Sequence, residues 1–391
     1  MIVIADDITG AAELAGITHE NGSGVCLLCG CSSGAGHDCS VACDSVAACG
    51  TTVIATDTRS MTEREAVVET RRIVSLLSPL TSHLFKKTDS ALRGHVVAEL
   101  EALMQATGFR RSVYVPANPS KGRIIRNGVY YIKEVSGEQQ EVRDIPIHET
   151  AFSYDPEFPA RTSVLKERFP QAEANGIIMP DAESEDDIRR VITQYDDGET
   201  LYAGAADLFK AWLEVKGKKL EKTPKTENSM PPHHTPLSST LILCGSTQSK
   251  PIDIGIPIVA MPREVYDGEQ TAADWFAQLS ACLSLWRGVE GESLILTIPH
   301  THRTGKAIAV HLRTTMAEMT RLLVARHRPD HLIIEGGATA WATLHALGWT
   351  TFEIQRQVAP GVVQMSATNG TLVTLKPGSY PWGGLFQSFS E

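Results

Sequence analysis

The sequence predicts an α/β protein with two domains, each built on a mainly parallel sheet flanked by helices. Short apolar runs that end in polar or glycine-rich turns alternate with segments of helical period, a pattern typical of parallel α/β architecture. The 391 residues exceed what one hydrophobic core usually organises. A polar stretch at 215–240, rich in Pro, Lys and Ser, interrupts the pattern and predicts a linker between domains at 1–214 and 241–391.

In the first domain, apolar runs predict strands and amphipathic segments predict helices. The expected strands are Met1–Ala5, Val25–Leu28, Thr52–Ala55, His83–Lys86, Ser112–Val115 and Gly176–Met179. The expected helices are Thr62–Leu77, Val96–Thr107 and Ser184–Tyr195, the last with a polar start suited to a helix N-terminus. Arg123–Ile132, with Asn127 and Gly128 at its centre, predicts a hairpin.

In the second domain the same alternation restarts and predicts a separate sheet. The expected strands are Leu241–Cys244, Ser293–Thr297 and His331–Glu335, and a helix is expected after the last of them, through Leu347.

Charge and hydropathy exclude several classes of partner. The formal net charge of −10 argues against nucleic acid and anionic membrane surfaces. No apolar run is long enough to cross a bilayer, and the chain begins with a strand-like segment rather than a basic leader. We therefore expect a cytoplasmic protein whose partners are small molecules, and we leave a homodimer open.

Six of the eight cysteines fall between Cys26 and Cys49. The spacing of Cys26, Cys29 and Cys31 resembles half of a zinc site, but no suitable second pair follows. We interpret the strand cysteines as small apolar residues and assign no metal ligand.

The first candidate site follows the first strand, where Asp6, Asp7 and Thr9 enter a turn before an Ala-rich helix. Ligands of parallel sheets bind outside the carboxyl ends of strands, so two carboxylates here suggest a functional site. The alternative is that one of them only caps the following helix.

A second strand ends in a similar mixture of side chains, and its candidate ligand-binding residues are Lys87, Asp89, Ser90 and Arg93. Carboxylate, hydroxyl and cationic groups suit a polyhydroxylated anion, and Arg93 offers a planar fork for a carboxylate. The alternative is a surface ion pair between Asp89 and Arg93, with Ser90 as a helix cap.

Three glycine-rich turns in the second domain suggest a nucleotide cleft. One turn contains Gly336, Gly337 and Thr339, one spans 244–248, and one spans 376–384. The free N–H groups of a turn between strand and helix can hold phosphate. None of the turns matches a P-loop or a dinucleotide fingerprint.

A series of motifs along nearly the whole chain resembles the four-carbon acid sugar kinases, ATP-dependent enzymes that phosphorylate threonate, erythronate and their oxo derivatives. The motifs are IADDITGAAELAG at 4–16, TDTRS at 56–60, KKTDSALRGHVVAEL at 86–100, PANPSKGRIIRNG at 116–128, CGST at 244–247, EGGAT at 335–339, PGV at 360–362 and LKPGSY at 375–380.

The resemblance implies that the N-terminal domain binds the sugar acid, that the C-terminal domain binds ATP, and that chemistry occurs in a cleft between them. It implies a substrate site of Asp6, Asp7, Lys87, Asp89, Ser90 and Arg93. The candidate catalytic residues are Asp7, Asp6 and Asp89, of which Asp7 is the favoured base and Asp6 or Asp89 would contact hydroxyls or metal, and the sequence leaves the choice among the three open. It implies a nucleotide site of Ser246, Gly336, Gly337, Thr339, Gly361, Lys376, Pro377, Gly378 and Ser379. Mg²⁺ on the phosphates completes the expectation, because phosphoryl transfer needs alignment and charge neutralisation.

Two alternatives stay open at this point. A non-catalytic sensor of nucleotide or sugar acid is suggested by Ala338, where the family usually carries an acidic residue, and by the altered turn at 377–381. An aspartyl-phosphate phosphohydrolase is suggested by the strand that ends in Asp6 and Asp7, but that mechanism needs a second Asp where Ile8 stands.

Overall fold

The computed structural model describes residues 1–30, 50–77, 83–136, 141–155, 157–217, 239–245, 254–282, 293–299, 305–378, 380–382 and 385–386. The chain divides into two compact units, the first formed by Met1–Asp6 with Cys31–Thr223 and the second by Asp7–Gly30 with Pro224–Glu391. Most of the expected linker at 215–240 lies outside the described residues. The boundaries expected for a sugar-acid domain and a nucleotide domain stay a prediction.

The first unit is built on parallel strands in the order β3-β1-β4-β10-β5-β9. Their bounds are β1 Ile2–Ala5, β3 Thr51–Ala55, β4 Leu84–Lys87, β5 Arg111–Val115, β9 Ile177–Ile178 and β10 Thr200–Gly204. Every residue of β1, β3, β4 and β10 is buried, as is typical of parallel strands covered on both faces.

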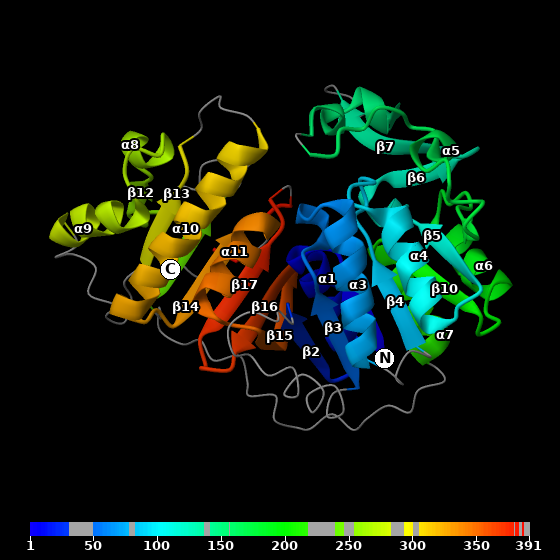
Figure 1. Ribbon diagram of the computed structural model, residues 1–391, viewed down its shortest axis with the longest axis horizontal. Coiled ribbons are helices and arrows are strands. Elements are labelled where there is room, and N and C mark those ends of the chain that lie inside the picture. The colour runs from blue at the N-terminus through cyan, green and yellow to red at the C-terminus, as the bar shows by residue number, and fades with distance from the viewer. Residues whose placement is uncertain are drawn as a thin grey trace. The chain divides into compact units, whose positions relative to one another are not determined.

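The helices of the first unit are α3 Glu63–Leu77, α4 Val96–Thr107, α5 Leu165–Arg168, α6 Glu185–Gln194 and α7 Ala206–Gly217. Figure 1 shows α3 and α4 in front of the strands, and these two helices pack on each other. Helix α6 begins with a capping box between Ser184 and Asp187, as its polar start predicts.

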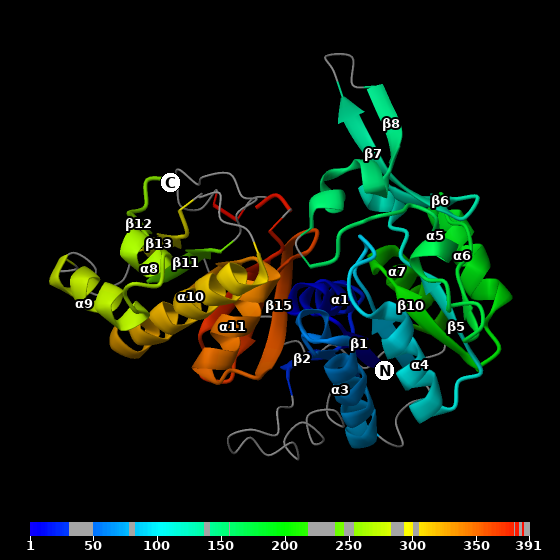
Figure 2. The ribbon, with the colours of Figure 1, turned by 45° about the horizontal axis from the view of Figure 1, so that its top comes forward.

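A separate antiparallel sheet of the first unit has the order β6-β7-β8, with β6 Arg123–Arg126, β7 Val129–Ser136 and β8 Glu141–Pro146. Asn127 and Gly128 form the tight turn between β6 and β7, with φ angles of 51° and 71°. Positive φ at both turn residues explains the Asn-Gly pair. In Figure 2, β7 and β8 extend as a two-stranded arm.

The second unit has parallel strands in the order β12-β13-β11-β14-β17, continued by β16, β15 and β2 through antiparallel pairing. The bounds are β2 Val25–Cys29, β11 Thr240–Cys244, β12 Ile258–Ala260, β13 Ser293–Thr297, β14 His331–Glu335, β15 Thr351–Ala359, β16 Val362–Ala367 and β17 Leu372–Lys376. Ile242, Ile295 and Ile333, from neighbouring strands, pack together in its core.

The helices of the second unit are α1 Ile8–Glu20, α8 Arg263–Tyr266, α9 Ala272–Cys282, α10 Lys306–His327 and α11 Gly337–Leu347. Helices α10 and α11 lie side by side in both ribbon views. None of the helices in the described ranges is apolar over a length that could cross a membrane.

The predicted α/β class and mainly parallel strand pairing are confirmed, and the second unit adds an antiparallel part. The expected strands and helices that fall on described residues are present with ends shifted by about one residue, and the 123–132 hairpin is present.

Candidate active site

In the first unit, polar side chains follow the carboxyl ends of three adjacent parallel strands. Asp6 follows β1 and Asp89 follows β4. Arg59 lies in the 3-10 turn Thr58–Ser60, which follows β3. Because β3, β1 and β4 are parallel neighbours, these side chains meet at one edge of the sheet.

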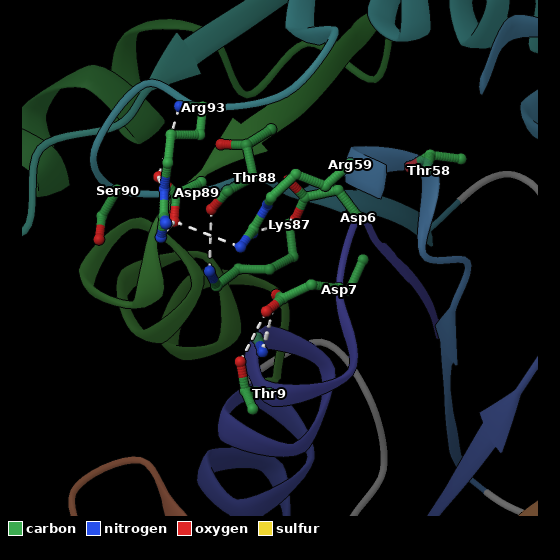
Figure 3. A network of polar contacts seen from close by, with 12 residues as sticks. Asp6, Asp7, Thr9, Thr58, Arg59, Lys87, Thr88, Asp89, Ser90 and Arg93 are labelled. Atoms are coloured by element: carbon green, nitrogen blue, oxygen red, sulfur yellow. Dashed lines mark hydrogen bonds and ion pairs between the residues drawn. The ribbon is translucent and has the colours of Figure 1, made fainter. Parts of the chain in front are cut away.

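Two bidentate ion pairs form this edge (Figure 3). Arg59 donates from Nε and Nη2 to the two oxygens of Asp6, at 3.0 Å each. Arg93 donates in the same way to Asp89, at 2.9 Å each. Arg59 Nη1 lies 3.6 Å from Asp89 Oδ1 and connects the two pairs. The expected fork of Arg93 therefore already holds a carboxylate of the protein.

The charge of Asp89 is fixed by these neighbours. Burial alone would raise the pKa of Asp89, but the guanidinium groups of Arg93 and Arg59 hold that pKa well below its usual value. In return, Asp89 raises the pKa of Arg93 despite the burial of the guanidinium. Asp89 and Arg93 thus form the ion pair that was the alternative interpretation, but the side chain of Asp89 is only 10% exposed.

The segment after β4 is held by a second set of contacts. Lys87 Nζ donates to the carbonyl of Thr88 at 2.8 Å, and the Ser90 hydroxyl accepts from Arg123 Nη1. The Tyr130 hydroxyl donates to the carbonyl of Ser90. Lys87 and Ser90, which the sequence singled out, are both buried here.

A buried network beneath this edge positions Arg59. Lys86 forms an ion pair with Glu99, whose side chain is 2% exposed. The same Glu99 oxygen accepts from the Thr58 hydroxyl at 2.8 Å. The residue that begins the turn of Arg59 is therefore tied through α4 to β4.

In the second unit, Asp7 caps helix α1. Its Oδ1 accepts from the backbone N–H of Gly10 at 2.9 Å, and its Oδ2 accepts from the Thr9 hydroxyl at 2.6 Å. The capping alternative is thus confirmed for Asp7.

The cap of α1 lies against the N-terminus of α11. A Cβ placed on Gly337 would be 3.1 Å from Asp7 Oδ2 and 3.2 Å from Thr9 Oγ1. Gly336, the residue before α11, has no side chain to cap the helix, and the first N–H groups of a helix can bind an anion. A carboxylate and a helix N-terminus that suits an anion are therefore neighbours within one unit.

Two further glycines mark close approaches at this end of the second unit. A Cβ on Gly245 would be 2.1 Å from Thr339 Oγ1. Gly361 has a φ of +79°, and a Cβ added to it would be 2.4 Å from the Tyr380 ring. One of these glycines lies beside α11 and the other beside the C-terminal segment, and Gly337, Thr339 and Gly361 all belong to the second unit.

A buried ion pair supports the glycine turns. Lys376, the last residue of β17, pairs with Glu335, the last residue of β14, and donates to the carbonyl of Gly378 at 3.2 Å. Lys376 Nζ also lies 4.7 Å from the centre of the Trp382 ring. Glu335 Oε2 has no hydrogen-bond partner in the described part of the chain. Burial, with the nearby charge of Glu335, raises the pKa of Cys244 to about 12.

Some of the expected site residues are not described and some functional candidates were missed. Ser246 and Ser379 lie outside the described residues. Arg59, Glu99, Arg123 and Glu335 were not singled out, although Arg59 lies in the quoted TDTRS motif and Arg123 in PANPSKGRIIRNG. Among the described residues, no group of three Cys, His, Asp or Glu side chains could hold a metal ion.

Comparison with known proteins matches two parts of this chain to named domains. Residues 1–174 match the model of a sugar-binding N-terminal domain, and residues 264–380 match that of a nucleotide-binding C-terminal domain. A 3-oxo-tetronate kinase of Salmonella typhimurium is 23% identical over 97% of this chain and 95% of its own length. A D-threonate kinase of the same organism is 25% identical over 92% of this chain and 89% of its own length.

The chain belongs to the four-carbon acid sugar kinase family. A crystal structure of a Salmonella typhimurium LT2 protein matches the fold of this family member with a TM-score of 0.72 and 18% identity, over 99% of this chain and 98% of the other. The Asp6 and Asp89 ion pairs lie within the sugar-binding match, and the turns at Gly337 and Gly361 lie within the nucleotide-binding match of this acid sugar kinase.

Proposed function

We propose that this protein is an ATP-dependent kinase that phosphorylates a hydroxyl of a four-carbon acid sugar of the threonate, erythronate or oxo-tetronate type. The observation that carries this proposal is the contact between Asp7 and the glycine turn at Gly337. A carboxylate beside a helix N-terminus can accept a proton from a hydroxyl while the turn holds the phosphates that the hydroxyl attacks.

Asp7 is the proposed base. Asp6 and Asp89 are each held by both arms of a guanidinium group, whereas Asp7 lies beside the glycine turn that would hold the phosphates. A carboxylate in a bidentate pair with arginine is a poor proton acceptor, because the ion pair favours the charged form. Asp6 and Asp89, with Lys87, Ser90 and Arg93, would instead orient the sugar acid.

The nucleotide would bind at the turns of the second unit. Gly336, Gly337, Thr339 and Gly361 would contact the phosphates and ribose, together with Lys376, Pro377, Gly378 and the undescribed Ser246 and Ser379. Mg²⁺ is usually held by phosphates with one or two protein carboxylates, and Glu13 and Glu335 provide carboxylates at these turns. When bound, the ion neutralises charge on the transferring phosphoryl group.

In the reaction, the substrate hydroxyl oxygen attacks the γ-phosphorus of ATP, its proton passes to Asp7, and the bond to the β–γ bridging oxygen breaks to release ADP. The two substrates would meet in an interdomain cleft. Asp6 ends the first segment of one unit and Asp7 begins the other. The residues that carry these two carboxylates are therefore adjacent in the chain.

Release of ADP from ATP and Mg²⁺ tests this function with a panel of threonate, erythronate and oxo-tetronate isomers. We expect one acid to be turned over at roughly 1–100 per second, with mass spectrometry detecting its phosphate ester. Binding of ATP without turnover of any member would instead indicate the sensor. Release of phosphate from phosphate esters without ATP would indicate the phosphohydrolase.

A further inference from the structure

Three guanidinium groups surround Asp89, and one of them differs from the others. Arg59 and Arg93 form ion pairs with Asp6, Asp89 and Asp155. Arg123 is close enough to Asp89 to lower its pKa, yet it forms no ion pair with a carboxylate in the described part of the chain. Its guanidinium contacts the Ser90 hydroxyl through Nη1 and lies over the Phe152 ring.

We propose that Arg123 binds the carboxylate of the sugar acid and thereby makes this site selective for acids over neutral sugars. The inference rests on the proposed function, because it names the residue that reads the acid group of that substrate. It also transfers to Arg123 the carboxylate-binding role that the sequence suggested for Arg93.

The geometry of Arg123 supports this role. Its guanidinium centre is 5.5 Å from the centre of the Phe152 ring. A guanidinium that lies over an aromatic face directs its N–H groups outward in its own plane, where a carboxylate can accept two of them. In the described part of the chain only Nη1 donates to another side chain, so the edge formed by Nε and Nη2 is available for a bidentate contact.

The backbone holds Arg123 in place before any ligand binds. Arg123 N–H donates to the carbonyl of Asn118 at 3.1 Å, and Asn118 N–H donates to the carbonyl of Arg123 at 2.8 Å. The side chain of Asn118 accepts from the backbone of Asp207 at 3.1 Å, which ties this turn to the start of α7. A fixed backbone lowers the entropic cost of ordering the arginine in the complex.

Arg93 is less suited to the same task. Both its Nε and Nη2 groups already donate to Asp89, and Nη1 lies 3.4 Å from Asp155. A substrate carboxylate would have to displace a carboxylate of the protein, whereas at Arg123 it would meet the Ser90 hydroxyl. Ser90 is then positioned to donate to the same acid, since a hydroxyl both donates and accepts.

The test compares Arg123→Gln with wild type on two ligands, the acid of the panel with the lowest KM and its neutral carboxamide. Wild type should bind the acid better than the carboxamide by roughly ten- to hundredfold, the fold-change that hydrogen bonds to a charged group are worth. Arg123→Gln should raise KM and Kd for the acid by that factor, leave the Kd of the carboxamide and the KM for ATP nearly unchanged, and so abolish the discrimination.

Arg126→Gln is the matched control, because Arg126 lies at the other end of the same strand and pairs with Asp144 and Glu183 at the surface. Its KM should equal that of wild type. Arg123→Lys, which keeps the charge without the fork, should give an intermediate KM for the acid and covers the case in which Arg123→Gln does not fold.

Each other outcome overturns the inference in a distinct way. If wild type phosphorylates an acid but Arg123→Gln and Arg123→Lys keep its KM, Arg123 does not bind the carboxylate and the kinase function stands. Equal loss of acid and carboxamide binding would also reject carboxylate recognition by Arg123. If wild type binds and phosphorylates no acid of the panel, the proposed function fails and this inference fails with it.

Discussion

Asp7 caps helix α1 and is also the proposed base, and a substitution by Asn can distinguish these two roles. In Asp7→Asn the side chain keeps an oxygen to accept from Gly10 N–H, so we expect helix α1 and thermal stability to be preserved. Loss of the base should lower kcat by roughly 10²- to 10⁴-fold with little change in ATP affinity. Steady-state kinetics and isothermal titration with ATP measure both effects.

The control for Asp7→Asn is Asp274→Asn, which alters a carboxylate in the first turn of another helix of the same unit, α9. We expect this variant to keep full kcat. Near-normal turnover of Asp7→Asn would remove Asp7 from the role of base.

The close approach of Gly337 to Asp7 gives a second prediction. In Gly337→Ala the added methyl group would lie 3.1 Å from Asp7 Oδ2, so the carboxylate or the turn must shift by a few tenths of an ångström. Because Gly337 is helical, the fold should tolerate Ala. We expect turnover to fall by about ten- to a hundredfold, as misplaced reacting groups usually cause. The melting temperature should be nearly unchanged.

Gly24→Ala is the matched control for Gly337→Ala, because a Cβ on Gly24 would meet nothing within 4 Å. Equal kinetics for the two alanine variants would show that Gly337 does not need its close approach to Asp7.

At this scale the sequence predicts acidic candidates better than their partners. Asp6 and Asp89 each follow an apolar strand and could be selected from the sequence alone. Arg59 could not be selected in this way, because its pairing with Asp6 depends on β3 lying beside β1. The order of strands in a sheet cannot be inferred from one segment of sequence. Arg123 was missed because the segment 123–132 was interpreted as a hairpin, and a hairpin gives no reason to expect a ligand at Arg123.

At the scale of elements, the buried ion pair between β4 and α4 predicts non-additive stability. Either single substitution, Lys86→Met or Glu99→Leu, would leave the other charge buried without its partner, which should lower the free energy of unfolding by about 3–5 kcal/mol. The double variant Lys86→Met with Glu99→Leu buries apolar groups instead and should lose less than either single variant. Urea unfolding of the four proteins measures this cycle, and additive losses would contradict the prediction.

Strand β14 carries a pH-dependent contribution to stability at His331. Burial, with a smaller effect of Arg356, lowers the pKa of His331 to about 4, and its Nε2 lies 2.8 Å from the Thr374 hydroxyl. In the unfolded chain His titrates near 6.5, so the unfolded state gains the proton first as the pH falls. The free energy of unfolding should therefore decline by about 3 kcal/mol between pH 6.5 and pH 4 from this residue.

Replacement by Gln tests this contribution, since Gln can keep the hydrogen bond to Thr374 without titrating. The difference in unfolding free energy between wild type and His331→Gln should be constant above pH 7. From there toward pH 4, wild type should lose stability relative to His331→Gln. Parallel pH profiles for both proteins would show that His331 does not titrate as expected.

Most of the parallel strands were predictable because continuous apolar runs between helices specify them, but the parallel strands β10 and β12 were not predicted. Strands β15, β16 and β17, which contain the antiparallel pairs β15–β16 and β16–β17, were not predicted either. Strand β15 alternates buried Phe352 and Ile354 with exposed Glu353 only at its start, and register shifts after Ile354 interrupt the alternation. The Pro360-Gly361 motif was interpreted as a nucleotide contact, and it also forms the turn between β15 and β16, where Ala359 pairs with Val362.

At the scale of the whole molecule, the proposed cleft predicts a response to two ligands. The chain passes between the units at 6–7, 30–31 and 223–224, so any rearrangement of the units acts at these points. Kinases with separate substrate and nucleotide lobes close when both ligands bind, because closure excludes water and completes the site. We expect the radius of gyration, measured by X-ray scattering, to fall when the acid and a non-hydrolysable ATP analogue bind together, and to fall less with either alone. Turnover without any change in scattering would indicate a preformed cleft.

The membership of α1 and β2 in the second unit has a practical consequence for dividing this protein into pieces. A fragment that begins at 241 would lack the helix that packs on β15 and β16 and the strand that pairs with β15. A fragment that ends at 214 would carry that helix and strand without β15 and β16. We therefore expect neither half to fold on its own, and splitting the gene at the polar stretch should yield aggregation-prone halves. Joining 7–30 to the C-terminal part through a designed loop, as in a permuted chain, is the division that the tertiary contacts support.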